Sequence, residues 1–263
     1  MTLIVHEWRA SRKSFYIWLG SIVVICFGCE LLYGSLENSL QGMADAYQNM
    51  GTFSQAFGMD QMSIATMEGF YATEIALMFG LGAAMFAGML GTAMLSKETE
   101  GHTAEFLYTL PNSRRKIVLL KYAAMILRIL LFNVISVTFF FLGFLLMKED
   151  VSIGGFFIYH IMCFLMQVEI ATICFFISAI SNKKNVGMGI GMVILCYALD
   201  MMCRLIPDLE KLKYVVPYYY ANAVDLFENG MKGMESMTVI GVVVTIVCLF
   251  SAVIIYEKKD INP

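Results

Sequence analysis

Two ionisable side chains lie deep inside apolar stretches of this chain of 263 residues. Arg128 and Glu169 belong to consecutive apolar runs, and at about 1.5 Å per helical residue both lie about 17 Å from the inner surface. A charge at this depth is unstable against lipid alone, so we predict that the two side chains form a buried ion pair. The pair would act either as a structural link or within a transport pathway, and the sequence leaves both roles open.

Two acidic residues lie near the outer ends of the first two apolar runs. These are Glu30 and Glu74, and the loop 37–69 between the runs adds four acids and no base. We predict an acidic outer mouth, which would favour release of a cationic or amphipathic substrate. The alternative is a solvated rim, because charges at the ends of spans can extend into water.

Redox, metal and nucleotide chemistry have no strong candidates. Cys26-x-x-Cys29 has a spacing typical of redox or metal pairs, but it lies in an apolar stretch without a nearby histidine, which favours simple packing. The three histidines, His6, His102 and His160, are far apart. The phosphate-binding loop G-x-x-x-x-G-K-[ST] is excluded, because it requires the dipeptide Gly-Lys, which is absent from this chain. We therefore expect no catalytic residue, no metal and no cofactor in this chain.

The elements that carry these residues are predicted to be membrane-spanning helices. The chain is 59% hydrophobic and 15% charged, whereas soluble domains average about 45–50% and about 25%. Six apolar runs are each long enough to cross a hydrocarbon layer about 30 Å thick. They cover residues 15–36, 70–95, 117–147, 154–180, 186–206 and 237–256. We predict an all-α integral membrane protein with one transmembrane domain, residues 1–263; the net charge of -3 does not indicate a nucleic-acid partner.

The positions of lysine and arginine predict the orientation. If the N-terminus is cytoplasmic, inner segments hold twelve of the eighteen basic residues, and the first outer loop holds none. The positive-inside rule then places both termini in the cytoplasm. The twelve are Arg9, Arg12, Lys13, Lys97, Arg114, Arg115, Lys116, Lys121, Lys183, Lys184, Lys258 and Lys259.

The N-terminal segment has an amphipathic pattern. Ile4, Trp8 and Phe15 fall on one arc of a helical wheel, and the opposite side is polar and basic. The pattern predicts an interfacial helix on the cytoplasmic leaflet, with Trp8 as its anchor. A basic flank that only sets the topology is the alternative.

Residues 101–121, GHTAEFLYTLPNSRRKIVLLK, interrupt the apolar pattern on the inner side. Thr103 is a candidate N-cap, and Glu105 in the first turn suits the positive end of a short helix. Phe106, Leu107 and Leu110 would share one face of this helix before Pro111 ends it. The segment is either a short helix that offers an apolar face to a soluble partner or an ordinary interfacial turn.

The stretch SKETEGHTAEFLYTLPNSRRKIVLLK resembles the segment that ABC-2-type transporter permeases carry between their second and third spans. The resemblance covers essentially the whole chain, and His102 is a modest departure from the family pattern. It implies a coupling helix that docks on a separate ATPase subunit. The coupling residues would be Thr103, Glu105, Phe106, Leu107, Leu110 and Arg114.

The same resemblance implies the rest of the assembly. Two ATPase subunits would bind ATP and Mg, and a second permease copy, identical or pseudo-identical, would complete a dimer. YVVPYYYANAVDLFENG resembles the region that forms re-entrant or external helices before the last span of such permeases.

The second span is rich in small residues and methionine. Gly80, Ala84, Gly88 and Thr92 recur every four residues, which predicts close helix packing. The second and fifth spans of ABC-2 exporters line the translocation path, so the resemblance implies a lining role for Met78, Met85 and Met89. Flexible methionines suit varied apolar guests, although ordinary packing also explains them.

Three functions compete. The resemblance implies a permease in a bacterial plasma membrane that exports a lipophilic or amphipathic substrate, peptide or drug-like, and is not itself an enzyme. The alternative is an ion-coupled secondary transporter that uses Glu169, Arg128 and Glu30, but such folds usually contain internal repeats, and the two halves show none. A membrane-embedded enzyme would require a nucleophile and base, or metal ligands, at one depth, and the sequence lacks them.

Overall fold

The computed structural model describes residues 2–101, 113–149 and 151–259, and these residues form helices and no strand. Six helices are long and apolar enough to cross a membrane, as predicted. They are α1 (Thr2–Gln48), α4 (Ala76–Ala93) with the short elements before it, α7 (Arg114–Met147), α8 (Ile153–Ile180), α9 (Val186–Leu205) and α12 (Glu235–Lys258).

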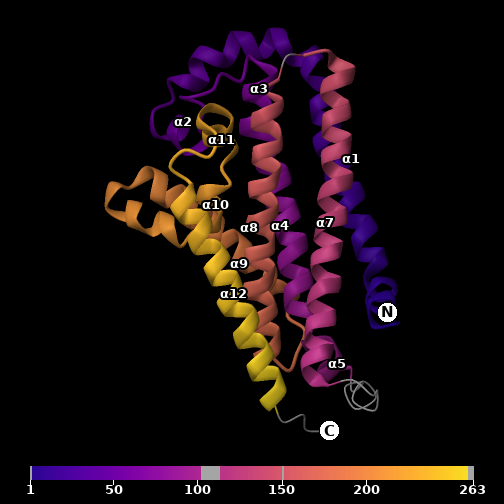
Figure 1. Cartoon of the computed structure of the whole chain (residues 1–263). Helices are drawn as coiled ribbons and strands as arrows, with labels where there is room; N and C mark the ends of the chain where they lie inside the picture. The colour runs from indigo at the N-terminus through magenta and orange to yellow at the C-terminus, as the bar shows by residue number, and fades with distance from the viewer. Residues whose placement is uncertain (1, 102–112, 150, 260–263) are drawn as a thin grey trace.

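The six long helices pack side by side (Figure 1). α1 and α7 form one flank, α9 and α12 the other, and α4 lies with α8 between them. Aromatic side chains join the first flank to α4: Phe86 of α4 stacks on Phe132 of α7 at 4.8 Å between ring centroids, and Phe15 of α1 contacts both rings. α4 is therefore the centre of the bundle.

Small residues allow α4 and α9 to approach closely. A Cβ atom built on Gly189 would lie 2.6 Å from the carbonyl oxygen of Gly88, and one built on Gly88 would lie 2.9 Å from that of Gly189. No side chain fits between such backbones, so both positions require glycine. Ala84, one turn from Gly88, is fully buried. The stripe predicted in the second span is thus a packing surface.

Short helices lie between the middle of the bundle and its end opposite the start of α1 (Figure 1). The last turns of α1 lie across this end, where Leu40 and Ala44 pack against Met59 and Ile64. The short elements are α2 (Thr52–Phe57), α3 (Met67–Phe70), the π-helix η1 (Tyr71–Ile75), the 3-10 helix η2 (Pro207–Tyr214), α10 (Pro217–Tyr220) and α11 (Ala223–Asn229). The last three are the helices predicted between the fifth and sixth spans.

The N-terminal helix is continuous with the first span. α1 runs from Thr2 to Gln48 without a break, because its sequence contains no proline. Of the apolar arc predicted to rest on the membrane, Phe15 is buried, and the half-buried Trp8 contacts it at 5.5 Å between ring centroids. The segment is thus continuous with the first span, and its apolar arc packs partly against the bundle.

Candidate functional site

A buried ionic cluster joins three helices at the end of the bundle where α1 begins, which we call the inner end and its opposite the outer end. The Lys121 ammonium of α7 donates to the Glu7 carboxylate of α1 at 3.0 Å and to the Glu98 carboxylate of α5 (Ser96–Glu100). Lys97 donates to the second oxygen of Glu7. Lys121 and Glu7 are fully buried, so each charge depends on its partners. We call Glu7, Lys97, Glu98 and Lys121 the inner ionic cluster.

The inner ionic cluster fixes the chain on both sides of residues 102–112. α5 precedes this segment, and α7 begins just after it, with the Ser113 hydroxyl accepting from the backbone N–H of Lys116 at 3.3 Å. The Glu100 carboxylate accepts from the backbone N–H of Lys184 at 2.8 Å, which holds the end of α5 against the inner loop between α8 and α9. The two ends of the segment are therefore attached to a rigid part of the bundle.

Five of the six predicted coupling residues, Thr103, Glu105, Phe106, Leu107 and Leu110, lie outside the described residues. The sixth, Arg114, contacts the end of α12: its guanidinium donates to the carbonyl oxygens of Glu257 at 3.2 Å and Lys259 at 2.9 Å. It therefore links the start of α7 to the chain beyond the last span.

Lys259 continues this link to α8. Its ammonium donates to the carbonyl oxygens of Ala179 at 3.0 Å and Ser181 at 2.7 Å, and thereby satisfies acceptors at the end of that helix. Partial burial lowers the pKa of Lys259. The start of α7 and the ends of α8 and α12 thus converge.

The predicted ion pair between Arg128 and Glu169 is wrong. The Arg128 guanidinium donates to the Ser11 hydroxyl and, at 2.8 Å, to the carbonyl oxygen of Glu7, and it lies 5.1 Å from the ring centroid of Trp8. Arg128 therefore faces α1. Depth had suggested the pair, but the two residues face different neighbours.

Glu169 joins α8 to α10 and α12. It accepts a hydrogen bond of 2.8 Å from the hydroxyl of Tyr220 in α10. A Cβ atom built on Gly241 of α12 would lie 2.5 Å from a carboxylate oxygen of Glu169, so glycine provides the space for this carboxylate. Tyr220 is buried, as is Tyr218.

Glu30 does not lie at an exposed acidic mouth. It is fully buried against Gly143 of α7, and its carboxylate oxygens have no hydrogen-bond partner among the described residues. Its position near the end of an apolar run had suggested access to water, which the packing of α1 on α7 removes. Glu74 is half-buried in the π-helix η1, and the structure does not bring the two acids together at one mouth.

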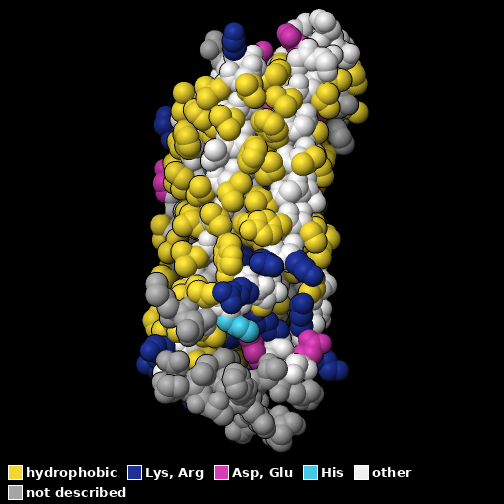
Figure 2. Space-filling view, turned by 90° about the vertical axis from the view of Figure 1, so that its right-hand side faces the viewer, with side chains coloured by type: hydrophobic (Ala, Val, Ile, Leu, Met, Phe, Trp, Pro, Cys, Tyr) yellow, Lys and Arg dark blue, Asp and Glu magenta, His cyan; other side chains and the backbone are white. Residues whose placement is uncertain are grey.

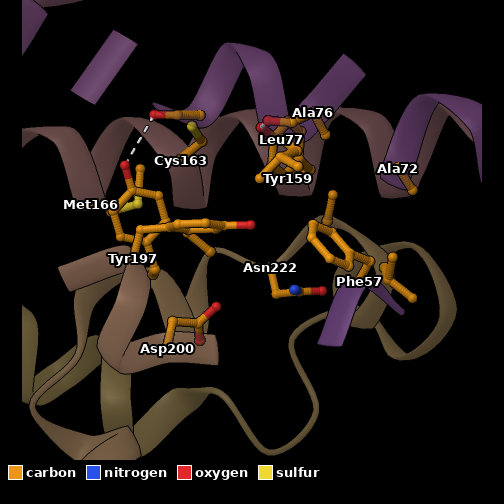
Figure 3. Close-up of a pocket in the computed structure, with 15 residues that line it drawn as sticks. Phe57, Ala72, Ala76, Leu77, Tyr159, Cys163, Met166, Tyr197, Asp200 and Asn222 are labelled. Carbon is orange, nitrogen blue, oxygen red and sulfur yellow. Dashed lines mark hydrogen bonds between the residues drawn. The ribbon is translucent and has the colours of Figure 1, made fainter. Parts of the chain in front are cut away.

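A small cavity lies under the outer helices (Figure 3). It measures about 60 Å³ and lies between η1, α4, α8, α9 and the segment of α10 and α11. Tyr159, Tyr197 and Tyr218 supply aromatic walls, and Asp200 and Asn222 are its polar lining. The Tyr159 hydroxyl donates to the carbonyl oxygen of Ala76 at 2.7 Å. The volume suits a few waters and is too small for a peptide or drug.

A second ionic cluster holds the outer helices on α9. Arg204 donates to Asp200 at 3.2 Å and to Asp225 of α11 at 2.8 Å, and its guanidinium lies 4.5 Å from the ring centroid of Tyr219. Beside it is a cleft of about 510 Å³, whose lining includes Asp60. The charged lining of this cleft comprises Asp60, Glu210, Asp225 and Arg204, which pairs with Asp225, and includes neither Glu30 nor Glu74.

Met78, Met85 and Met89 share one face of α4, because spacings of seven and four residues return to the same side of a helix. Each side chain is half-buried. Gly82 lies beside this stripe, close to Ile22 of α1. The three methionines therefore form a continuous, partly open stripe, and ordinary packing remains compatible with it.

The sequence reasoning missed both ionic clusters as functional features. Glu7 is a lone acid in a basic segment, Lys121 lies in an apolar run, and Asp200 and Arg204 have the i, i+4 spacing of a helical ion pair. These signals were available, but none identifies a partner on another helix. Among the described residues, no group of three His, Cys, Asp or Glu side chains is arranged to hold a metal ion.

Comparison with known proteins finds one family. A family model described as ABC-2 family transporter protein matches residues 1–261. A search of curated proteins finds no similar sequence.

Proposed function

Because the chain belongs to the ABC-2 family of transporter proteins, we propose that it is the transmembrane subunit of an exporter driven by a separate ATPase. The transporter role rests on the family match over residues 1–261. The inner ionic cluster flanks the segment to which we assign ATPase binding, and this position supports the assignment. The protein would reside in a bacterial plasma membrane with both termini in the cytoplasm, as the distribution of basic residues favours.

In this proposal the ATPase contacts the segment that carries the six predicted coupling residues, from Thr103 to Arg114. Lys97 before the segment and Lys121 after it share the Glu7 carboxylate, and Lys121 also pairs with Glu98. A displacement of the segment by the ATPase would therefore move α1, α5 and α7 together, because a buried ionic cluster resists separation of its members. This arrangement suits force transmission better than a free turn would.

Two copies of the permease and two ATPase subunits form the complete machine, with a path beside α4 and α9. The half-buried methionines at 78, 85 and 89 support a wall that accepts varied apolar groups. The acid-lined outer cleft near Asp60 and Asp225 supports release of a cationic or amphipathic molecule. We therefore favour a lipophilic or amphipathic substrate, such as a peptide or a drug-like molecule.

Reconstitution tests the energy source. The permease is placed in vesicles with and without its ATPase, and efflux of a fluorescent cationic amphiphile is followed under ATP or under an ion gradient alone. We expect transport only with ATPase and ATP. Transport by the permease alone under an ion gradient would contradict the proposal and favour the secondary transporter.

A further inference from the structure

A groove runs between the inner end of α1 and the facing side of α7. It measures about 380 Å³, within the range of ligand pockets, which begins at about 300 Å³. Its lining combines one charged residue with apolar ones: Arg128, Trp8, Leu127, Leu130, Leu131 and Val134. The leucines at 127, 130 and 131 are exposed, so the groove is open to whatever surrounds the helices.

Arg128 brings to this groove a positive charge that forms no direct ion pair among the described residues. Its side chain is only 1% exposed, and its Nε–H has no hydrogen-bond partner among the described residues. Its other contacts are a hydroxyl and a carbonyl oxygen rather than a carboxylate. The nearby Glu7 carboxylate already accepts from Lys97 and Lys121. A buried guanidinium with a free donor and no directly bonded carboxylate among the described residues is costly, so it provides a site for an anionic ligand.

The groove lies where apolar surface meets basic surface. Arg128 contacts Glu7 and Ser11 of α1, and the same stretch of α1 exposes Arg9, Arg12 and Lys13. Figure 2 shows this flank, on which a broad hydrophobic band gives way to Lys and Arg side chains toward the lower end. Because basic side chains of this kind lie at the level of lipid headgroups, the groove opens at the boundary between headgroups and acyl chains. Arg128 therefore lies nearer the membrane surface than its place in the apolar run predicted.

We propose that the groove binds one anionic phospholipid of the leaflet on the N-terminal side. Its phosphate is attracted by the Arg128 guanidinium and accepts from the buried Nε–H when that side chain turns toward the groove, and its acyl chains lie along Leu127, Leu131 and Val134. A soluble anion gains nothing from these apolar walls, whereas a phospholipid satisfies both the charge and the apolar surface. The groove belongs to α1 and α7 alone, so it is separate from the methionine stripe of α4 and from the proposed transport.

The test measures lipid selectivity. The protein is placed in phosphatidylcholine vesicles, and the association of spin-labelled phosphatidylglycerol is compared with that of spin-labelled phosphatidylcholine. For the unaltered chain we expect a preference for phosphatidylglycerol of about fivefold at this site, the factor typical of one basic residue near a membrane surface. Arg128→Gln should abolish the part of the phosphatidylglycerol preference that arises from the groove.

Two further variants separate lipid binding from folding. Leu131→Trp fills the groove and leaves Arg128 in place, so it should also abolish that component of the preference. Leu142→Trp is the matched control, because Leu142 is an exposed leucine of the same helix outside the groove; it should keep the full preference. An unchanged preference in Leu131→Trp would overturn the proposal. So would displacement of the labelled lipid by glycerol phosphate in the water phase or by the transported amphiphile, which would assign the groove to a soluble anion or to substrate.

Discussion

At the scale of single residues, Glu169 illustrates how one glycine makes room for a buried acid. Its carboxylate accepts from Tyr220, and the missing side chain at Gly241 of α12 leaves space for it. A methyl group at position 241 must displace the carboxylate or separate two helices. The site thus links the fourth span, the last span and the outer helices through one small contact.

Gly241→Ala should therefore destabilise the protein. A built Cβ lies 2.5 Å from the Glu169 carboxylate and 3.2 Å from the Tyr220 ring, and overpacking of this kind costs about 1–3 kcal/mol. Thermal unfolding in detergent measures the effect. The control is Gly28→Ala in α1, whose Cβ meets no atom within 4 Å. Equal melting temperatures for Gly241→Ala and the unaltered protein would show that the two helices yield without cost.

Lys121 is the residue on which the inner ionic cluster depends most. Lys121→Met leaves the buried Glu7 and part-buried Glu98 carboxylates with Lys97 as their remaining lysine, and loss of one partner of a buried ion pair costs about 3–5 kcal/mol. We expect a large fall in thermal stability, with partial recovery when Glu7→Gln is added. Lys116→Met, an exposed neighbour on the same helix, serves as control. A Lys121→Met protein as stable as this control would mean that the cluster contributes nothing to the fold.

At the scale of elements, the sequence predicted the spans well and their partners poorly. Hydropathy and length define a helix that crosses the membrane, and all six expected helices are present. The depth of a charge along a helix does not say which neighbour it faces, which is why Arg128 contacts α1 rather than Glu169. The same limit applies to Glu30, whose place near a helix end concealed its burial against Gly143.

The contact between α4 and α9 offers a matched test within one helix. Gly189→Ala places a methyl group 2.6 Å from the Gly88 carbonyl oxygen, whereas Gly191→Ala meets nothing within 4 Å. The first change should cost about 1–3 kcal/mol of stability because the backbones must separate. The second should be neutral or slightly stabilising, since alanine favours a helix over glycine. Thermal unfolding measures the stability of the two variants. Equal melting temperatures for Gly189→Ala and Gly191→Ala would show that the α4–α9 contact is loose.

At the scale of the whole molecule, the proposed machine divides its tasks between the two ends of the bundle. The inner end gathers the buried cluster of Glu7 and Lys121 and the cap that Lys259 places on α8. The outer end carries the cavity, the acid-lined cleft and the short helices held by Arg204. α4 contacts neighbours along its whole length between these ends, so movement at one end can be transmitted to the other.

The proposed function depends most on the segment that carries the coupling residues, from Thr103 to Arg114. Its coupling role rests on the pattern of Phe106, Leu107 and Glu105, and the structure contributes only the anchored flanks. Apolar side chains outside the bilayer stabilise a protein contact by about 25 cal/mol per Å² buried. Their removal should therefore weaken ATPase binding without changing insertion or thermal stability.

The most direct measurement is the affinity of the ATPase for the double variant Phe106→Ala, Leu107→Ala in vesicles, taken alongside ATP-driven transport. We expect binding to weaken at least about tenfold, a loss of about 1.4 kcal/mol, and transport to collapse, while Lys116→Ala retains both. Full ATPase binding and full transport by the double variant would contradict the account and leave the segment as an ordinary turn at the membrane surface.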